Sequence, residues 1–194
     1  MTTTVAIEGG PLAEPVESRW DELVGAARAG DRAALDGLLE AIERRVYTFA
    51  YRLAGDRAAA EDVAQDALLK ICRRLDQYRG GNFLGWVYRI VVNQARDARR
   101  AAARWVGEPI EIAVLPGHDP ARTEQLRRLE EAWRVLSQKE RAALTLTDLE
   151  GLSSAEAARI LGCLAVTARV RAAQARKKLR RELSRYYPEL RETT

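Results

Sequence analysis

A stripe of polar side chains runs along an otherwise apolar segment, FLGWVYRIVVNQARDARR. Its members follow at i, i+4, i+7 and i+11, so they share one face of a helix; they are Arg89, Asn93, Arg96 and Arg100. Tyr88 lies beside this stripe. Cations contact phosphates, and aromatic rings offer faces on which unpaired bases stack. The spacing therefore indicates a surface for single-stranded nucleic acid.

The loop in front of this segment, Arg79-Gly80-Gly81-Asn82, could form a small pocket beside the stripe. We include Arg79 and Asn82 in the candidate surface for that reason. Trp86 and Phe83 fall on the apolar side of the predicted helix. A position in the core explains them better than base stacking does.

A second candidate surface lies in SSAEAARILGCLAVTARVRAAQARKK, which begins at Ser153. Ser153 and Glu156 have the spacing of a capping box, and Gly162 is placed for a left-handed turn. A basic helix follows from near Ala165, which is how a helix-turn-helix appears in a sequence. Arg and Gln can bond base edges in the major groove, and the candidates for DNA contact are Arg169, Arg171, Gln174, Arg176 and Lys177. An ordinary solvated basic face is the alternative.

A third candidate surface is acidic. On a helical wheel of the predicted helix 57–75, apolar side chains from Ala60 to Leu75 form one stripe. The opposite side holds Glu61, Asp62, Gln65 and Asp66, with Leu69 in their midst. An aliphatic side chain centred in an exposed acidic face fits a protein-partner contact. A solvated face with one stray leucine fits equally well.

Helical periodicity predicts the elements that must position these side chains. Helices are expected from near Glu17 and over residues 31–54, 57–75, 83–103, 123–136, 138–149, 153–161 and from 165 onward. The fold class is therefore all-α, with two small helical domains joined by a flexible linker, the C-terminal one a helix-turn-helix. The expected boundaries are a disordered tail 1–16, a first domain 17–105, a linker 106–122, a second domain 123–187 and a C-terminal tail 188–194.

The charge distribution agrees with two nucleic-acid contacts. The net charge is +4, but residues 79–104 carry six basic side chains and one acidic, and residues 165–194 carry nine and three. Two basic segments in more acidic surroundings indicate two polyanion contacts. No signal-peptide pattern and no run of about 18 apolar residues occurs, so we expect a cytoplasmic protein without membrane insertion.

Catalysis and metal binding find little support in the sequence. The one histidine, His118, lies in a Pro/Gly-containing segment, and no nucleophile–base pairing or phosphate loop is evident. Cys72 and Cys163 lie far apart without metal-ligand spacing, and we expect both to be buried thiols. We therefore expect neither an enzyme nor a metal or cofactor site.

Three segments together resemble one family. AEDVAQDALLKICRRL (residues 60–75) resembles the core-polymerase-binding motif of bacterial sigma factors. GWVYRIVVNQARDARR (residues 85–100) is similar to their promoter −10 segment, and LSQKERAALTLTDLEGLSSAEAARILG (residues 136–162) to the start of their −35-reading domain. The linker is too short for the extra three-helix domain of larger members. The resemblance is thus to the extracytoplasmic-function (ECF) group of the sigma-70 family, with region 2 and region 4.

The resemblance implies a role for each surface. The acidic face would dock on the β′ clamp helices of core RNA polymerase, and the β flap is a further implied contact. The residue set Arg79, Asn82, Tyr88, Arg89, Asn93, Arg96 and Arg100 would capture the melted −10 strand. Thr167, Val170 and Ala173 would join the basic candidates at the −35 element. A cognate anti-sigma factor is a further implied partner.

Departures from the family pattern affect both DNA surfaces. The loop RGGNFLGW is about one residue shorter than the commonest pattern between its Gly and Trp. Leu164 stands where the family often has a polar residue or Pro, and Val166 stands where it often has Gly. The recognition helix therefore lacks a side-chain N-cap. Val170 and Ala173 offer methyl contacts to thymine instead of hydrogen bonds. The rival interpretation, a stand-alone helix-turn-helix repressor or activator, would leave the first domain's two charged faces without a role.

Overall fold

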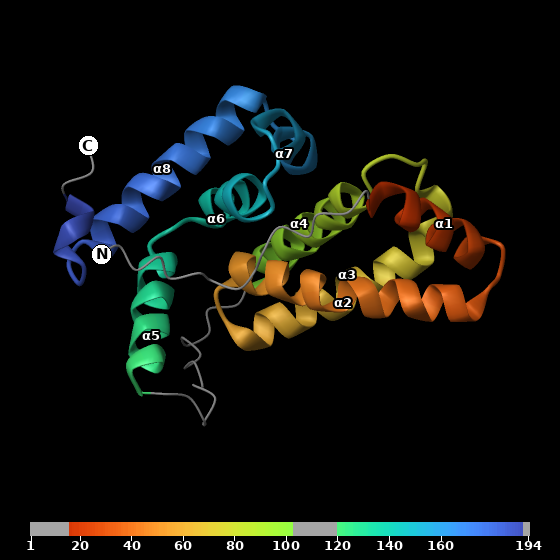
Figure 1. Cartoon of the computed structure of the whole chain (residues 1–194), viewed down its shortest axis with the longest axis horizontal. Helices are drawn as coiled ribbons and strands as arrows, with labels where there is room; N and C mark the ends of the chain where they lie inside the picture. Colours follow the sequence, from red (N-terminus) through yellow and green to blue (C-terminus); the bar gives the residue numbers. More distant parts are fainter. Residues whose placement is uncertain (1–15, 103–119, 192–194) are drawn as a thin grey trace, which may run out of the picture.

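The described chain consists of helices joined by short turns (Figure 1). The structure is a computed structural model in which residues 16–102 and 120–191 are described. The N-terminal half holds α1 (Val16–Arg28), α2 (Arg32–Ala54), α3 (Arg57–Arg74) and α4 (Phe83–Ala102). The C-terminal half holds α5 (Pro120–Arg134), α6 (Gln138–Leu144), α7 (Ser154–Leu161) and α8 (Ala165–Leu183). Neither described range contains a strand, which confirms the all-α prediction.

Short irregular helices complete the elements. A 3-10 turn, η1 (Leu75–Gln77), follows α3, and a π-helical turn, η2 (Thr145–Leu149), continues α6. The sequence predicted one uninterrupted helix over 138–149, so the change of helix type was missed. A further 3-10 turn, η3 (Pro188–Arg191), lies where a tail was expected, closed by a hydrogen bond from Leu190 N to Tyr187 O at 3.1 Å.

The predicted tail and linker fall largely outside the described residues. Val16, the last residue of the expected tail, already begins α1, and Pro120 begins α5 inside the expected linker. Proline suits the first turn of a helix because its missing N–H would have no partner there. No helix in the described ranges is long and apolar enough to cross a membrane.

The core of the N-terminal half is built around α2. Its buried stripe consists of Leu38, Ile42, Val46, Phe49, Ala50 and Leu53. α3 and α4 pack on this stripe through aliphatic side chains such as Ile71 and Val91, each fully buried. Burial of side chains of this size typically contributes about 1.5–3 kcal/mol each. The four rings at the start of α4 pack at centroid distances of 5.4–5.8 Å, and they are Trp20, Tyr78, Phe83 and Trp86.

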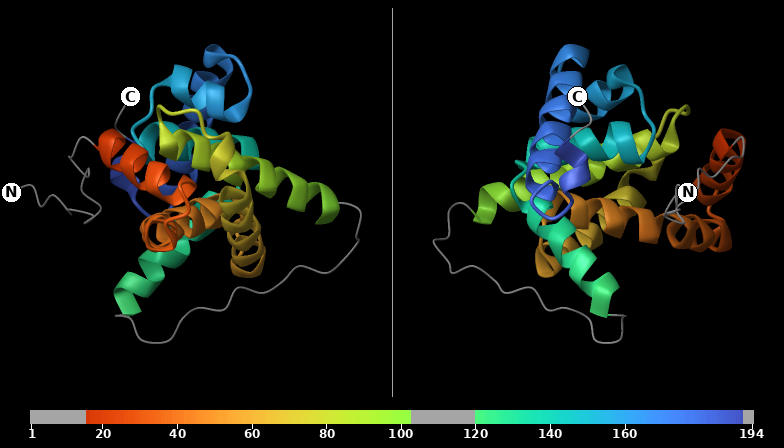
Figure 2. Two further views of the ribbon diagram at one scale, coloured as in Figure 1. Left: turned by 90° about the vertical axis from the view of Figure 1, so that its right-hand side faces the viewer. Right: turned by 60° about the vertical axis from the view of Figure 1, so that its left-hand side comes forward.

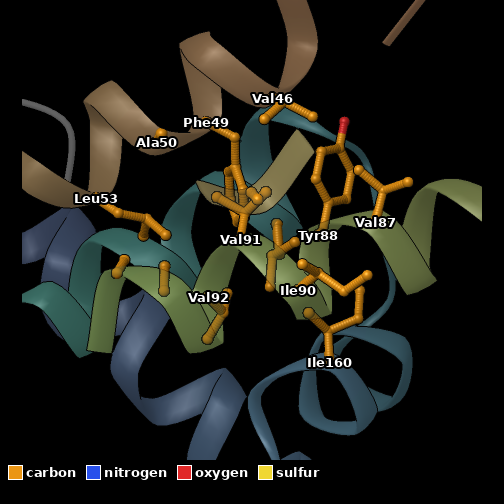
Figure 3. Close-up of a cluster of buried hydrophobic side chains, with 14 of the residues drawn as sticks. Val46, Phe49, Ala50, Leu53, Val87, Tyr88, Ile90, Val91, Val92 and Ile160 are labelled. Carbon is orange, nitrogen blue, oxygen red and sulfur yellow. The ribbon is translucent and has the colours of Figure 1, made fainter. Parts of the chain in front are cut away.

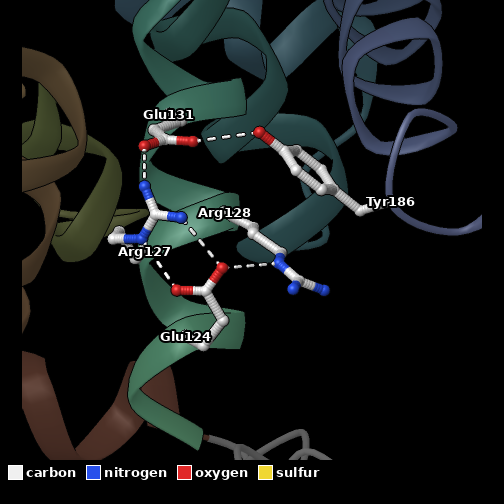
Figure 4. Close-up of polar contacts among 5 residues, drawn as sticks. All are labelled: Glu124, Arg127, Arg128, Glu131 and Tyr186. Carbon is white, nitrogen blue, oxygen red and sulfur yellow. Dashed lines mark hydrogen bonds and ion pairs between the residues drawn. The ribbon is translucent and has the colours of Figure 1, made fainter. Parts of the chain in front are cut away.

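The C-terminal half packs around α8. Leu136, Leu144 and Ala175 form a small buried cluster between α6 and α8. α5 contacts the end of the chain through Tyr186, whose hydroxyl donates to Glu131 at 3.2 Å (Figure 4). The Arg128 guanidinium lies 5.0 Å from the centre of the same ring. Along α5, Arg127 pairs with Glu124 and Glu131, and the hydrogen bond from Arg127 is the main cause that lowers the pKa of Glu124 to about 2.

α5 exposes more apolar surface than its pattern predicted. The sequence places Leu126, Leu129, Trp133 and Leu136 on one helix face. Leu136 is buried and Trp133 half-buried, but Leu126 and Leu129 are 47% and 45% exposed. The face therefore reaches the core at its C-terminal end only.

The two halves share one apolar core (Figure 3). Ile160 of α7 lies in the same buried cluster as Ile90 and Val92 of α4, and α6 packs beside α2. Figure 2 shows α7 stacked against α4 from two further directions. The C-terminal half thus lies directly on the helix that carries the predicted single-strand surface.

Candidate nucleic-acid interface

The helix-turn-helix is present as predicted. Ser153 Oγ accepts from Glu156 N at 3.3 Å, and Glu156 Oε2 accepts from Ser153 N at 2.8 Å. Gly162 ends α7 with φ +63°, a conformation that favours glycine. Ala157, Ile160 and Leu161 are buried, as expected. The capped and buried helix α7 and the turn at Gly162 therefore fix the position of α8.

One side of α8 is available to a large ligand. Ala168, Ala172 and Ala175 are buried against the rest of the half at helical spacing. The opposite side holds predicted contact residues that are exposed, and they are Arg169, Val170, Ala173, Gln174, Arg176 and Lys177. Thr167 and Arg171 are half-buried at its edge. A helix that reads a DNA groove requires small side chains on its buried side and long polar side chains on its exposed side, and α8 has both.

Two cations of α8 are committed to contacts within the protein. Arg176 Nη1 lies 2.8 and 3.0 Å from the two carboxylate oxygens of Asp148. Lys178 Nζ lies 2.8 Å from Glu140, which is buried. Burial alone would raise the pKa of Glu140, but hydrogen bonds from Lys178 and Ser137 outweigh it and the pKa falls below its usual value. These pairs fix α8 against α6 and η2.

The start of α8 is apolar and uncapped. Leu164 is the N-cap residue, makes no side-chain capping bond and is 72% exposed. Val166 and Val170 are 51% and 46% exposed on the same end of the helix. This confirms the missing cap expected from the sequence. An apolar end of this kind can contact thymine methyl groups in the major groove.

On α4 the predicted stripe is divided. Arg89, Asn93 and Arg100 are exposed, and Arg100 also pairs with Asp97. Arg96 is half-buried, and its Nη2 donates to the Leu161 carbonyl of α7 at 2.7 Å. Three of the four stripe residues thus face solvent, and Arg96 contacts the C-terminal half of the chain.

Tyr88 occupies a buried position that the sequence did not predict. It is 2% exposed, its ring lies 4.7 Å from that of Phe49, and its hydroxyl donates to Glu150 Oε2 of the C-terminal half. Burial, with the charge and hydrogen bond of Glu150, raises the pKa of Tyr88. In this arrangement no base can stack on Tyr88. The prediction that Tyr88 flanks the stripe with its ring available to unpaired bases is therefore wrong for this arrangement.

The loop before α4 is ordered by its own polar groups. Asn82 Oδ1 accepts from Gly85 N at 2.6 Å and so caps α4. Arg79 Nη1 donates to the Asp76 carbonyl at 3.4 Å, and both Arg79 and Asn82 remain exposed. Gly80 and Gly81 have φ of +86° and +88°. Phe83 is buried and Trp86 half-buried against it, which supports their prediction as core residues.

The acidic face of α3 lies where the helical wheel placed it. Ala60, Val63, Ala64, Ala67 and Ile71 are buried, whereas Asp62, Gln65 and Asp66 are exposed. Leu69 is 54% exposed. Glu61 forms an i,i+4 pair with Arg57 at 2.8 Å. α3 packs mainly on α2 and α4, so this face stays uncovered.

The two cysteines are more exposed than the sequence predicted. Cys72 and Cys163 are half-buried, not buried as expected, and burial still raises the pKa of the Cys72 thiol. Within the described ranges no group of three or more His, Cys, Asp or Glu side chains could hold a metal ion.

Two family descriptions match the chain. Sigma-70 region 2 matches residues 38–105, and Sigma-70 region 4 matches residues 126–179. The chain is 34% identical to the ECF RNA polymerase sigma factor SigE of Mycolicibacterium smegmatis, over 92% of this chain and 76% of that protein. It is 33% identical to the ECF RNA polymerase sigma factor SigM of Mycobacterium tuberculosis, over 84% and 83%.

Solved structures show a related fold. The sigma factor RpoE of Bartonella quintana, solved in complex with the anti-sigma factor NepR, superposes with a TM-score of 0.65 at 25% identity. The match covers 77% of this chain and 96% of that one. CnrH, solved with the cytosolic domain of CnrY, gives a TM-score of 0.63 at 24% identity, over 84% and 96%.

Proposed function

The chain belongs to the ECF sigma factors of the sigma-70 family and is a transcription initiation factor, and from that premise we propose a role for each of its three surfaces. In this proposal region 2 comprises α1–α4 and region 4 comprises α5–α8. The chain itself carries no catalysis, since it selects the site at which the polymerase acts.

The acidic face of α3 docks on core RNA polymerase at the β′ clamp helices. Leu69 forms the apolar centre of this contact, and Glu61, Asp62, Gln65 and Asp66 form its polar rim. An exposed leucine has no packing role in region 2, whereas an apolar centre inside a polar rim is the usual arrangement of a protein interface. Region 4 supplies the contact with the β flap.

The α4 surface captures the melted −10 strand. Arg79, Asn82, Arg89, Asn93 and Arg100 are exposed on the loop and helix, with Arg96 at the edge. Tyr88 joins this set only where a rearrangement frees its ring from Phe49 and its hydroxyl from Glu150. A cationic track beside an aromatic ring is what unpaired bases and their phosphates require.

The outer side of α8 reads the −35 element. Arg169 and Gln174 are placed to bond base edges, whereas Lys177 and Arg176 suit phosphates, and Arg171 and Thr167 lie at the margin. Val170 and Ala173 contribute methyl contacts, so more of the recognition depends on phosphates and DNA shape.

The observation that carries this assignment is Leu69, exposed at the centre of an acidic face that nothing in the described chain covers. A stand-alone helix-turn-helix repressor has no use for such a face. Run-off transcription with purified core polymerase and a promoter library tests the proposal. We expect transcripts from a subset of promoters only when the chain is added. Specific duplex binding by the chain alone, without any transcription, would instead indicate a repressor.

An anti-sigma factor is a further proposed partner. The support is the likeness to RpoE of Bartonella quintana, which was solved in complex with the anti-sigma factor NepR. We expect a protein that binds both regions and that competes with core polymerase for the chain in the cytoplasm. Competition in a pull-down with purified core polymerase checks this expectation.

A further inference from the structure

A pocket of about 500 Å³ lies at the joint between region 2 and region 4. Its walls come from α2 and α4 of region 2 and from α6, α7 and α8 of region 4. Within the described residues the pocket is lined by no carboxylate and by five cations, namely Arg96, Arg99, Arg100, Lys139 and Arg171. Pockets of about 300–1,000 Å³ are of the size that holds small molecules. A concave site lined by one sign of charge concentrates ligands of the opposite sign.

Most of these cations have no charged partner in the described chain. Three of them form no ion pair there, and they are Arg99, Lys139 and Arg171. Arg96 Nη2 donates to the Leu161 carbonyl at 2.7 Å, which is a neutral partner. Arg100 alone among the five pairs with a carboxylate of the described residues, that of Asp97. The pocket therefore holds positive charge that a bound anion can neutralise.

A sixth cation, Arg141, adds to the positive charge of the joint. It is 9% exposed, and its guanidinium donates at 3.2–3.4 Å to the backbone carbonyls of Leu53, Ala54, Trp133 and Arg134. Burial, with the charges of Arg134 and Arg99, lowers the pKa of this guanidinium. Glu150 of region 4 lies 3.3 Å from Arg52, but neither residue lines the pocket. The positive charge at the joint is thus in excess.

A second pocket of about 400 Å³ adjoins the first, and the two share Leu53, Arg99 and Gln138. Its wall is largely aliphatic and includes Ala59, Val63, Ala95, Ala98, Ala102 and Leu136. The carboxylate that lines it, Asp56, is the N-cap of α3, and its Oδ1 accepts from Ala59 N at 2.9 Å. Gln138 Nε2 donates to the Ala95 carbonyl at 3.0 Å, which holds this side chain at the boundary of the two pockets. An apolar wall beside a cationic pocket suits a ligand with one apolar and one anionic end.

We propose that the joint binds a nucleoside polyphosphate, with its phosphates among the cations of the first pocket and its base against the aliphatic wall of the second. Arg99 lines both pockets and contacts the ligand between base and phosphates. Arg99 and Lys139 belong to neither DNA surface, so the site is separate from the −10 and −35 contacts. Because its walls come from both regions, the nucleotide bridges region 2 and region 4.

Isothermal titration calorimetry of the full chain, in buffer without divalent metal, tests the phosphate side of the site. The probes are ATP, GTP, tripolyphosphate and guanosine. We expect ATP or GTP to bind about ten-fold more tightly than tripolyphosphate, because the base buries apolar surface, and guanosine not to bind measurably. Arg99→Ala combined with Lys139→Ala should lower the nucleotide affinity about ten-fold, through loss of charged contacts to phosphate. Arg32→Ala combined with Arg44→Ala removes two exposed cations of α2 outside the pocket and should leave it unchanged.

A further variant tests the base side. Ala98→Leu fills the second pocket, so it should reduce the nucleotide affinity to that of tripolyphosphate and leave tripolyphosphate binding as in the wild type. Circular dichroism shows whether the variant keeps its helices. If it does not, Ala102→Leu, at an exposed position of the same wall, takes its place. A wild-type chain that binds neither nucleotide, or that binds both no more tightly than tripolyphosphate, overturns the proposal. An equal loss of affinity in the Arg32 and Arg44 control overturns it too, because binding would then follow net charge alone.

Discussion

Leu68 and Leu69 are neighbours in sequence with opposite environments. Leu68 is partly buried against the core of region 2, while Leu69 is 54% exposed among acidic side chains. A step of 100° around the helix accounts for the difference. The two leucines therefore separate a packing role from a binding role at one place in the chain.

We expect Leu69→Ala to keep the melting temperature of the wild type and to lose core-polymerase affinity. Exposed substitutions usually change stability by less than about 0.5 kcal/mol, whereas loss of an interface anchor costs about 2 kcal/mol, about 30-fold in affinity. Asp66→Lys should weaken binding further. Leu68→Ala is the control and should melt earlier. A Leu69→Ala protein that melts early, or that binds polymerase as tightly as the wild type, contradicts the assignment.

Arg169 and Gln174 are the side chains on α8 that can read bases. Arg169→Ala or Gln174→Ala should weaken promoter-dependent transcription while core-polymerase affinity stays unchanged. Each bidentate base contact is worth about 1–3 kcal/mol of discrimination. Lys177→Ala should instead weaken binding to all duplexes alike and lower its salt dependence. Loss of polymerase affinity in the Arg169 or Gln174 variants would identify α8 as a protein-binding surface.

At the scale of single elements, much of the structure could be predicted from the sequence. The stripe of α2, the capping box at Ser153 and the turn at Gly162 follow from periodicity and local hydrogen bonding, and each is present. The π-helical turn after Leu144 could not be predicted, because its residues continue the pattern of α6. The burial of Tyr88 was missed for a different reason. Its partner Glu150 lies 62 residues away, and no local pattern indicates that contact.

The cations of the α4 stripe predict a defect in promoter melting. Arg89→Ala combined with Arg96→Ala should impair opening of the −10 region more than formation of the closed promoter complex, because both side chains follow phosphates of the unpaired strand. Permanganate reactivity of unpaired thymines in the holoenzyme measures opening. Arg32→Ala combined with Arg44→Ala removes two exposed cations of α2 and should leave opening unchanged. Normal opening in the α4 double variant would remove strand capture from this face.

The contact between α6 and α8 predicts a pH dependence of stability. The folded-state pKa of Glu140 lies below its usual 4.5, so its contribution is present above that pH and is lost as the pH falls through the folded value. Glu140→Gln keeps a capping side chain at the start of α6 but loses the charge that pairs with Lys178. We expect the variant to melt earlier at pH 7 and the difference to shrink below about pH 4.5. A difference that is constant with pH would assign the loss to packing.

At the scale of the whole molecule, the contact between region 2 and region 4 at Arg141 could not be predicted from the sequence. Arg141 bonds backbone carbonyls, which every residue possesses, and its partners in α2 lie 87 and 88 residues away. A charged side chain in a predicted helix would ordinarily be assigned to the surface. Family resemblance describes the surfaces that meet polymerase and DNA, whereas the arrangement of the two regions in the free chain required the structure.

The charges at the contact between the two regions predict an unusual effect of salt on the compactness of the free chain. A contact held by surface ion pairs loosens as ionic strength rises, but here the pocket between the regions holds five cations and no carboxylate. Screening of these like charges by salt should therefore stabilise the packing of region 4 on region 2. Between about 0.02 M and about 0.3 M NaCl, where the Debye length falls from about 20 Å to about 6 Å, the radius of gyration of the free chain should decrease. Lys139→Gln removes one pocket cation and should make the chain more compact at low salt. An increase of the radius with salt would show that the Arg52–Glu150 pair dominates the joint, and Glu150→Gln would then abolish the dependence.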